Sequence, residues 1–147
     1  VARPPRLLVA AAVAVLLIAA GAGGYLLAPR GDANAVDVST ILSEPGARLV
    51  HFGGTAQGNL AIAYQPGLPD VYVLGSALQQ PPSGKTYELW MFRGNTPVSG
   101  GCFVPNDGQL LEHVDADLSG TDSMAVTVEP NDCPSGPSTQ PILSAQL

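Results

Sequence analysis

The chain has 147 residues, which is enough for one domain and an appended segment but hardly for two domains. Charged residues make up only 12% of the chain, and the net charge is −6. Beyond an apolar N-terminal segment, four basic residues stand against twelve acidic ones, which gives that region a net charge of −8. Because so acidic a surface repels phosphate backbones, we expect no binding to nucleic acid.

The first predicted element is an uncharged apolar run over residues 7–28. A helix needs about 20 apolar residues to cross the hydrocarbon core of a bilayer, so this run is long enough. Arg3 and Arg6 precede it, and the positive-inside rule then places the N-terminus in the cytoplasm. We therefore predict a single-pass protein of the cell membrane: a cytoplasmic stub (1–6), a transmembrane helix (7–28), a linker (29–36) and an extracytoplasmic domain (37–147).

A cleaved signal peptide is the alternative interpretation of the N-terminal region. Ala33, Asn34 and Ala35 form an A-x-A pattern of the kind that signal peptidases cut. The apolar run is longer than the usual core of a signal peptide, about 7–15 residues, and the A-x-A pattern lies rather far beyond it. We favour a retained anchor, and both interpretations place the rest of the chain outside the cytoplasm.

Short apolar runs alternate with turn residues through the rest of the chain. Residues 37–42 fit either a brief helix or a first strand. Strands are expected over 47–52, 59–64, 70–78, 109–114, 123–129 and 142–147, with a hairpin over 85–104. Seven or eight short strands at intervals of about ten residues predict an all-β fold, an antiparallel β-sandwich behind one transmembrane helix.

The hairpin over 85–104 holds the only tryptophan of the chain, Trp90. Successive side chains of a strand point to opposite faces of the sheet. Tyr87, Leu89 and Met91 therefore share one face, and Glu88 and Trp90 share the other with residue 92. A strand with large side chains on both faces is typical of the interior of a sheet, packed on one face and sheltered on the other.

Cys102 and Cys133 are the only cysteines. Outside the cytoplasm an even number of cysteines favours a disulfide, and two separate buried thiols are the alternative. The bond would attach the Pro-rich loop at 131–137 to the central hairpin. A zinc site is poorly supported, because His51 and His113 lie far from the cysteines in sequence.

The remaining polar patterns give little support for chemistry. Asp115, Asp117 and Gly120 resemble the start of a calcium loop, but Val126 stands where a bidentate glutamate is needed, so we expect a solvated acidic turn. Neither histidine has a nucleophilic partner by motif. Glu88 and Glu129 would make a carboxylate pair, but nothing in the sequence places them together. We therefore predict no enzyme, no catalytic residue, no metal and no cofactor.

Four motifs in order resemble the C-terminal domain of anti-sigma-K factors of the RskA type. They are a leucine-proline entry at 68–69, the strand PSGKTYELW at 82–90, the return strand PVSGGCF at 97–103 and the strand VTVEP at 126–130. The resemblance covers about residues 36–147, with the anchor added by its position. The residues that form the structural core of these motifs are Tyr87, Leu89, Trp90, Phe103, Val126 and Val128.

The resemblance implies an outer sensory domain of a membrane-anchored negative regulator of an extracytoplasmic-function sigma factor, with membrane or envelope proteases that release the sigma factor. The family's sigma-binding part lies N-terminal to the anchor. Only six residues precede Leu7, so we expect that part to be absent from this chain and assign sigma binding to no residue. The alternative is a stand-alone anchored β-sandwich that binds an envelope ligand or partner and has no role in transcription.

Overall fold

The computed structural model describes residues 39–147, and the predicted stub, transmembrane helix and linker lie outside the described residues. The described part is mostly β, with one short helix at 39–43. No helix among residues 39–147 has the length and apolar character needed to cross a membrane. The nine strands are β1 (Arg48–His51), β2 (Gly53–Gly54), β3 (Asn59–Tyr64), β4 (Asp70–Ser76), β5 (Lys85–Arg93), β6 (Thr96–Phe103), β7 (Leu110–Asp115), β8 (Ser123–Pro130) and β9 (Leu143–Gln146).

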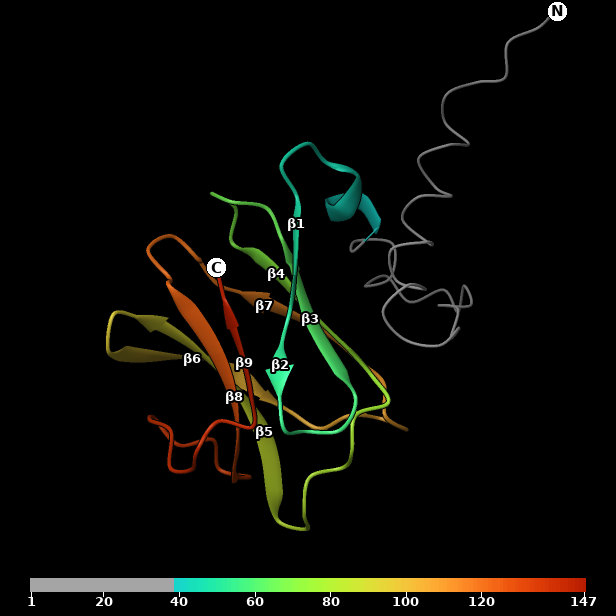
Figure 1. The fold of residues 1–147 in the computed structure, drawn as a ribbon, viewed down its shortest axis with the longest axis vertical. Helices are drawn as coiled ribbons and strands as arrows, with labels where there is room; N and C mark the ends of the chain where they lie inside the picture. The colour runs from blue at the N-terminus through green and yellow to red at the C-terminus, as the bar shows by residue number, and fades with distance from the viewer. Residues whose placement is uncertain (1–38) are drawn as a thin grey trace, which may run out of the picture.

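The strands form two antiparallel sheets that face each other (Figure 1). The four-stranded sheet has the order β1-β3-β4-β7, and the five-stranded sheet has the order β2-β9-β8-β5-β6. The prediction of seven or eight strands missed β2, whose two glycines pair with Ser144 and Leu143 of β9. The chain therefore changes sheets at Phe52, between β1 and β2.

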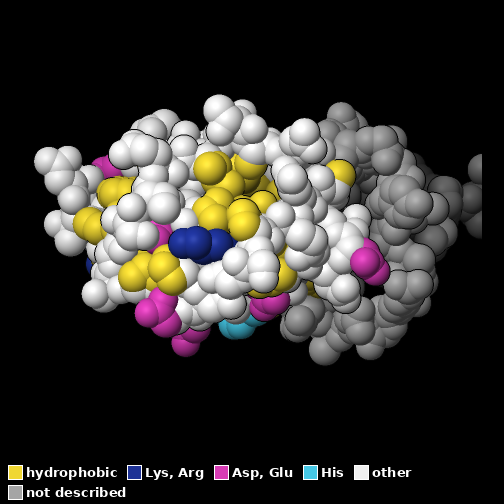
Figure 2. All heavy atoms as spheres, turned by 90° about the horizontal axis from the view of Figure 1, so that it is seen from below, with side chains coloured by type: hydrophobic (Ala, Val, Ile, Leu, Met, Phe, Trp, Pro, Cys, Tyr) yellow, Lys and Arg dark blue, Asp and Glu magenta, His cyan; other side chains and the backbone are white. Residues whose placement is uncertain are grey.

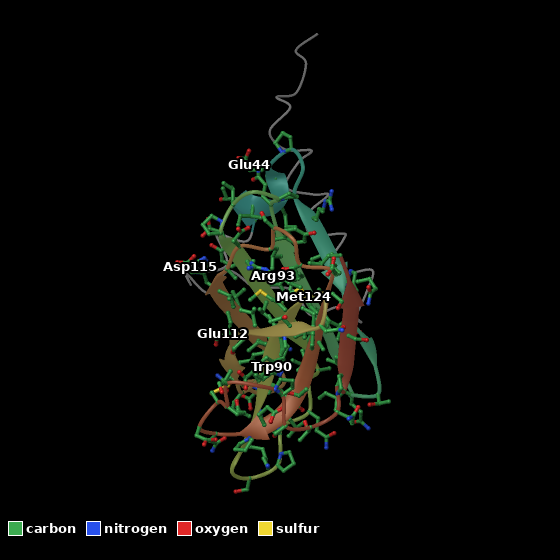
Figure 3. The ribbon with its side chains drawn as sticks, turned by 90° about the vertical axis from the view of Figure 1, so that its left-hand side faces the viewer. Glu44, Trp90, Arg93, Glu112, Asp115 and Met124 are labelled. Carbon is green, nitrogen blue, oxygen red and sulfur yellow. A yellow bond between two sulfur atoms is a disulfide. The ribbon has the colours of Figure 1, made fainter. Side chains whose placement is uncertain are left out.

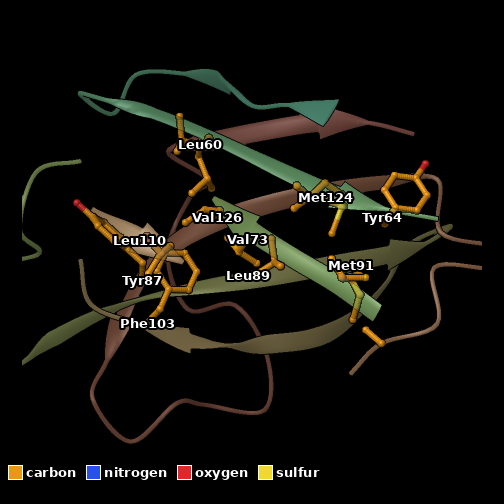
Figure 4. Close-up of a cluster of buried hydrophobic side chains, with 14 of the residues drawn as sticks. Leu60, Tyr64, Val73, Tyr87, Leu89, Met91, Phe103, Leu110, Met124 and Val126 are labelled. Carbon is orange, nitrogen blue, oxygen red and sulfur yellow. The ribbon is translucent and has the colours of Figure 1, made fainter. Parts of the chain in front are cut away.

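The hydrophobic core lies between the two sheets (Figure 4). β5 contributes Tyr87, Leu89 and Met91, which all lie on the face that the alternation predicts. Tyr87 and Phe103 stand opposite each other on β5 and β6, with ring centroids 5.9 Å apart. The core residues from the other strands include Leu60, Ile62, Val71, Val73, Leu110, Met124, Val126 and Leu143, and Val128 is partly buried against them.

A second, smaller apolar cluster covers the outer face of the four-stranded sheet. Ala63 and Tyr72 are its buried members, and Ile41 and Leu42 of the short helix pack against them. Residues 37–42 were expected to be either a helix or a strand, and the structure shows a helix at 39–43. The first described element of the chain is thus docked on the sheet.

The surface of the described domain is acidic, because ten acidic residues stand against three basic ones and, of the ten, only Glu88 and Glu129 are buried. Figure 2 views one end of the molecule, where hydrophobic side chains surround a basic one and acidic side chains lie around the margin. Among the described large hydrophobic residues, the most exposed are Leu68, Val98 and Val104. Val98 lies on β6, and Val104 directly follows that strand.

Gly84 ends the turn that leads into β5, and its backbone predicts a small, specific cost of substitution. Its φ is +76°, in the left-handed region, and a Cβ atom at this position would meet nothing within 4 Å. Gly84→Ala is therefore expected to lower the free energy of unfolding by about 1–2 kcal/mol through backbone strain alone. Urea denaturation measures this, and Gly136→Ala is the matched control, because Gly136 has equal space without a left-handed φ. Equal stabilities for the two variants would contradict the expectation.

Candidate functional site

The outer face of the five-stranded sheet carries a buried polar cluster. Glu88 and Trp90 come from β5, and Thr127 and Glu129 come from β8; each is at most 1% exposed. Their side chains point away from the inter-sheet core, because the residues that alternate with them along both strands face that core. Figure 3 views the molecule from the side of β6, with Trp90 labelled. Side chains on the outer face of a sheet are buried only where another part of the chain packs against them.

The strand register brings the two glutamates of this cluster together. β5 and β8 are antiparallel neighbours in which Glu88 lies opposite Thr127 and Thr86 lies opposite Glu129. Glu88 and Glu129 are therefore diagonal neighbours on one face, with Cβ atoms about 7 Å apart. The sequence offered no means of placing them side by side, because the pairing of β5 with β8 is long-range.

The segment that follows β8, residues 131–141, is attached to this face at Glu129, and we call it the strap. It contains no helix or strand. The backbone N–H of Ser138 donates to Glu129 Oε1 at 2.9 Å, and the N–H of Thr139 donates to the same oxygen at 3.3 Å. The Ser138 hydroxyl donates to Glu129 Oε2, and the Thr139 hydroxyl donates to the carbonyl of Val128 at 3.1 Å. The strap is thus hydrogen-bonded to β8 near its end.

A disulfide attaches the strap near its beginning. Cys102 of β6 is bonded to Cys133, with the two Cα atoms 6.2 Å apart. This confirms the disulfide that the even number of cysteines favoured. Cys102 lies directly opposite Glu88 in the β5–β6 register. The attachments on β6 and β8 lie on either side of β5, so the strap crosses over β5 near Glu88 and Thr86, which lie opposite Cys102 and Glu129.

A chain of hydrogen bonds links Trp90 to the strap. The indole Nε1–H donates to Thr127 Oγ1 at 2.8 Å, and the Thr127 hydroxyl is hydrogen-bonded to the Glu129 carboxylate. Glu129 in turn accepts from Ser138 and Thr139. The buried polar groups of Trp90, Thr127 and Glu129 are therefore all hydrogen-bonded, and these three residues avoid the desolvation cost of unpaired groups.

The environments of the two glutamates shift their pKa values in opposite directions. Burial raises the pKa of Glu88, and the charge of nearby Glu129 adds to the increase, against a smaller lowering by the hydrogen bond from Ser99. Burial alone would also raise the pKa of Glu129, but hydrogen bonds from Ser138, Thr127 and Thr139 outweigh it and hold that pKa below its ordinary value. Of the two carboxyl groups, Glu129 therefore has the environment that favours the charged form.

Only one of the two carboxylate oxygens of Glu88 has a hydrogen-bond partner among residues 39–147. Ser99 Oγ donates to its Oε1 at 2.6 Å, whereas its Oε2 is buried and has no hydrogen-bond partner among residues 39–147. A buried carboxylate oxygen without a partner is costly when ionised, which agrees with a raised pKa for Glu88. Two carboxyl groups with opposed pKa shifts are an acid–base arrangement, but both of them are fully buried. The prediction that the chain is not an enzyme stays a prediction.

The other polar residues singled out in the sequence lie elsewhere. Asp117 Oδ1 accepts from the N–H of Ser119 at 2.8 Å, and this turn lowers the pKa of Asp117 through its hydrogen bonds to Ser119. His113 contacts Asp70, with Nε2 to Oδ1 at 2.8 Å, and its ring lies 4.9 Å from that of Tyr72. His51 is exposed at the end of β1. Within residues 39–147, no group of three or more His, Cys, Asp and Glu side chains is arranged to hold a metal.

Comparison with known proteins supports the resemblance carried by the four motifs. A family model described as "Anti-sigma-K factor rskA, C-terminal" matches residues 7–142. Comparisons with curated proteins and with solved structures find no match. The family match includes both the apolar run at 7–28 and nearly all of the two-sheet domain with its strap. On this match, the chain belongs to the family of anti-sigma-K factor C-terminal domains.

Proposed function

We propose that residues 37–147 are the extracytoplasmic, signal-receiving domain of an anti-sigma factor that is anchored by a transmembrane helix at 7–28. The observation that carries this proposal is the family match over 7–142, which joins the apolar run to the folded domain in one unit. The Cys102–Cys133 disulfide supports an oxidising compartment for the domain. Arg3 and Arg6 before the apolar run favour the same orientation.

In this proposal the domain regulates a sigma factor without touching it. The sigma factor is held on the cytoplasmic side by a part of the regulator that lies N-terminal to the anchor. The state of the outer domain governs whether membrane or envelope proteases cut the anchor and release the sigma factor. The outer domain's contribution is therefore a conformational one, and it requires neither a cofactor nor catalysis by the domain.

Topology is the first test, made with fusions after Leu147 in cells. Alkaline phosphatase, which is active only outside the cytoplasm, is expected to be active there, and green fluorescent protein exported through the same route is expected to be dark. Exchanging Arg3 and Arg6 for glutamate is expected to weaken this difference, since it removes the basic residues that precede the anchor. The proposed orientation would be contradicted if the green fluorescent protein fusion were fluorescent and the alkaline phosphatase fusion inactive.

Transcription is the second test. Deleting residues 39–147 while keeping the segment before them is expected to raise expression from the sigma factor's promoters severalfold, because the restraint on anchor cleavage is lost. Sequencing of total RNA measures this, with the intact chain as reference. Unchanged expression in a deletion that keeps the correct topology would contradict the regulatory proposal. Such a result would favour an anchored binding domain with no transcriptional role.

A further inference from the structure

The strap has two attachments of different chemical kinds. Near its beginning it is held covalently by Cys133 to Cys102 of β6, and near its end it is held by hydrogen bonds from Ser138 and Thr139 to Glu129. Between these points it contains no helix or strand, so no ladder of backbone hydrogen bonds holds it to the sheet. Loss of one attachment therefore leaves the strap dependent on the other.

The buried side chains linked to the strap through Glu129 and Thr127, or placed where it crosses β5, are those that would change most on its release. Trp90, Glu88 and Glu129 are 0% exposed although they lie on the outer face of the sheet. Glu129 receives most of its hydrogen bonds from the strap itself. Opening the strap would therefore bring water to both carboxyl groups and to the indole, while the core between the sheets would stay covered.

The disulfide is open to attack from one side. Cys133 is exposed, whereas Cys102 is half-buried on β6. The backbone of Cys133 also has φ +52°, in the left-handed region that residues other than glycine seldom adopt. A thiolate that approaches from solvent therefore meets the sulfur of Cys133 first. Breaking the bond would free this residue to leave its strained conformation.

We propose that the Cys102–Cys133 bond is a site of thiol–disulfide exchange with a dithiol reductant, and that its reduction opens the strap over Trp90. The reductant's thiolate attacks Cys133 Sγ, the S–S bond breaks, and Cys102 leaves as a thiolate that takes a proton from solvent. The reductant's second thiolate then attacks the mixed disulfide and releases Cys133, which is protonated in turn. The protein gains two electrons and two protons, and the dithiol becomes a disulfide.

Two features favour the open state once the bond is broken. The hydrogen bonds to Glu129 and to the Val128 carbonyl must then offset the conformational entropy of the 11-residue strap without the covalent attachment. Glu88, once in contact with water, is also released from the burial that disfavours its charged form, so ionisation of Glu88 favours the open state. The opening of the strap is a signalling event only if the domain is a regulator, so its role in signalling rests on the proposed function.

The test uses the full chain in detergent micelles, with dithiothreitol as the dithiol and Trp90, the only tryptophan, as the reporter. Reduction is expected to expose two titratable thiols per chain. It should also shift the Trp90 emission to longer wavelength and increase its quenching by acrylamide severalfold. The far-UV circular dichroism of the sheets should stay the same. Unchanged quenching after both thiols have titrated would overturn the proposal, and so would loss of the β signal.

Two variants sharpen the result. The double variant C102S/C133S is expected to show the quenching of the reduced protein from the start and no response to dithiothreitol. Ser138→Ala is expected to stay closed while oxidised and to open further than the parent on reduction, because it weakens only the second attachment. A closed double variant would contradict the proposal. These fluorescence results do not depend on transcription, so the strap and the proposed function can fail separately.

Discussion

Trp90→Ala is expected to lower the free energy of unfolding by about 3–5 kcal/mol. The side chain is fully buried, and its loss leaves a large cavity on the outer side of the five-stranded sheet. The substitution also removes the indole Nε1–H, which donates a hydrogen bond to Thr127 Oγ1. Since small domains have only about 5–15 kcal/mol of stability in total, the change should be easy to see. Urea denaturation followed by far-UV circular dichroism is the suitable measurement, because the variant has no tryptophan to report fluorescence.

The matched control is Trp90→Phe, which keeps an aromatic ring but has no N–H. It is expected to lose less stability than the alanine variant, because most of the buried volume is retained and one hydrogen bond is worth about 1 kcal/mol. An unchanged urea midpoint in the alanine variant would show that Trp90 does not contribute to folding. It would make the residue available as a binding surface instead.

The second large effect is expected at Glu129, where Glu129→Gln should lower stability by about 1.5–3 kcal/mol at neutral pH. The amide has the size of the carboxyl group but cannot accept charge-assisted hydrogen bonds, and its NH2 group faces donors from Ser138 and Thr139. Glu88→Gln is the matched control on the same face, and it is expected to leave stability unchanged or to raise it. The burial that raises the pKa of Glu88 disfavours its charge.

The two glutamates should also give opposite dependences on pH. The lowered pKa of Glu129 stabilises the fold above the ordinary glutamate range, and this contribution is lost as the pH falls through the folded-state pKa. The raised pKa of Glu88 stabilises the fold below that range, and this contribution is lost as the pH rises through the folded-state pKa. Urea midpoints of the two variants across the acidic and neutral range measure both trends. Equal effects at the two positions would contradict the opposite directions of the two pKa shifts.

Much of the fold follows from alternation and turn residues. The strand expected at 59–64 coincides with β3, and the hairpin at 85–104 contains β5 and β6. β2 could not be predicted in the same way, because Gly53 and Gly54 have no side chains from which a pattern could be read. Its existence depends on β9, whose residues Leu143 and Ser144 are far away in the sequence. Local propensity carries no information about such a pairing.

The site was partly predictable. The alternation of side chains along a strand places Glu88 and Trp90 on one face of β5. The even number of cysteines favours the disulfide that holds the strap. What the sequence lacks is the neighbour of β5, since only the pairing with β8 brings Glu129 and Thr127 to this face. The strap was recognisable as a Pro-rich turn segment, but its role as a cover depends on Ser138 and Thr139 reaching Glu129. Those contacts are tertiary and leave no periodic signal.

The crossing of the chain from one sheet to the other at Phe52 also imposes an order on assembly during synthesis. β1, β3 and β4 can pair soon after they are made, because they are joined by short connections. β2 follows β1 directly, yet it has no partner until β9, the last strand, has been made. A nascent chain that stops before residue 143 would leave both β2 and β8 with an open side. The second sheet is therefore completed only after the whole domain has left the ribosome.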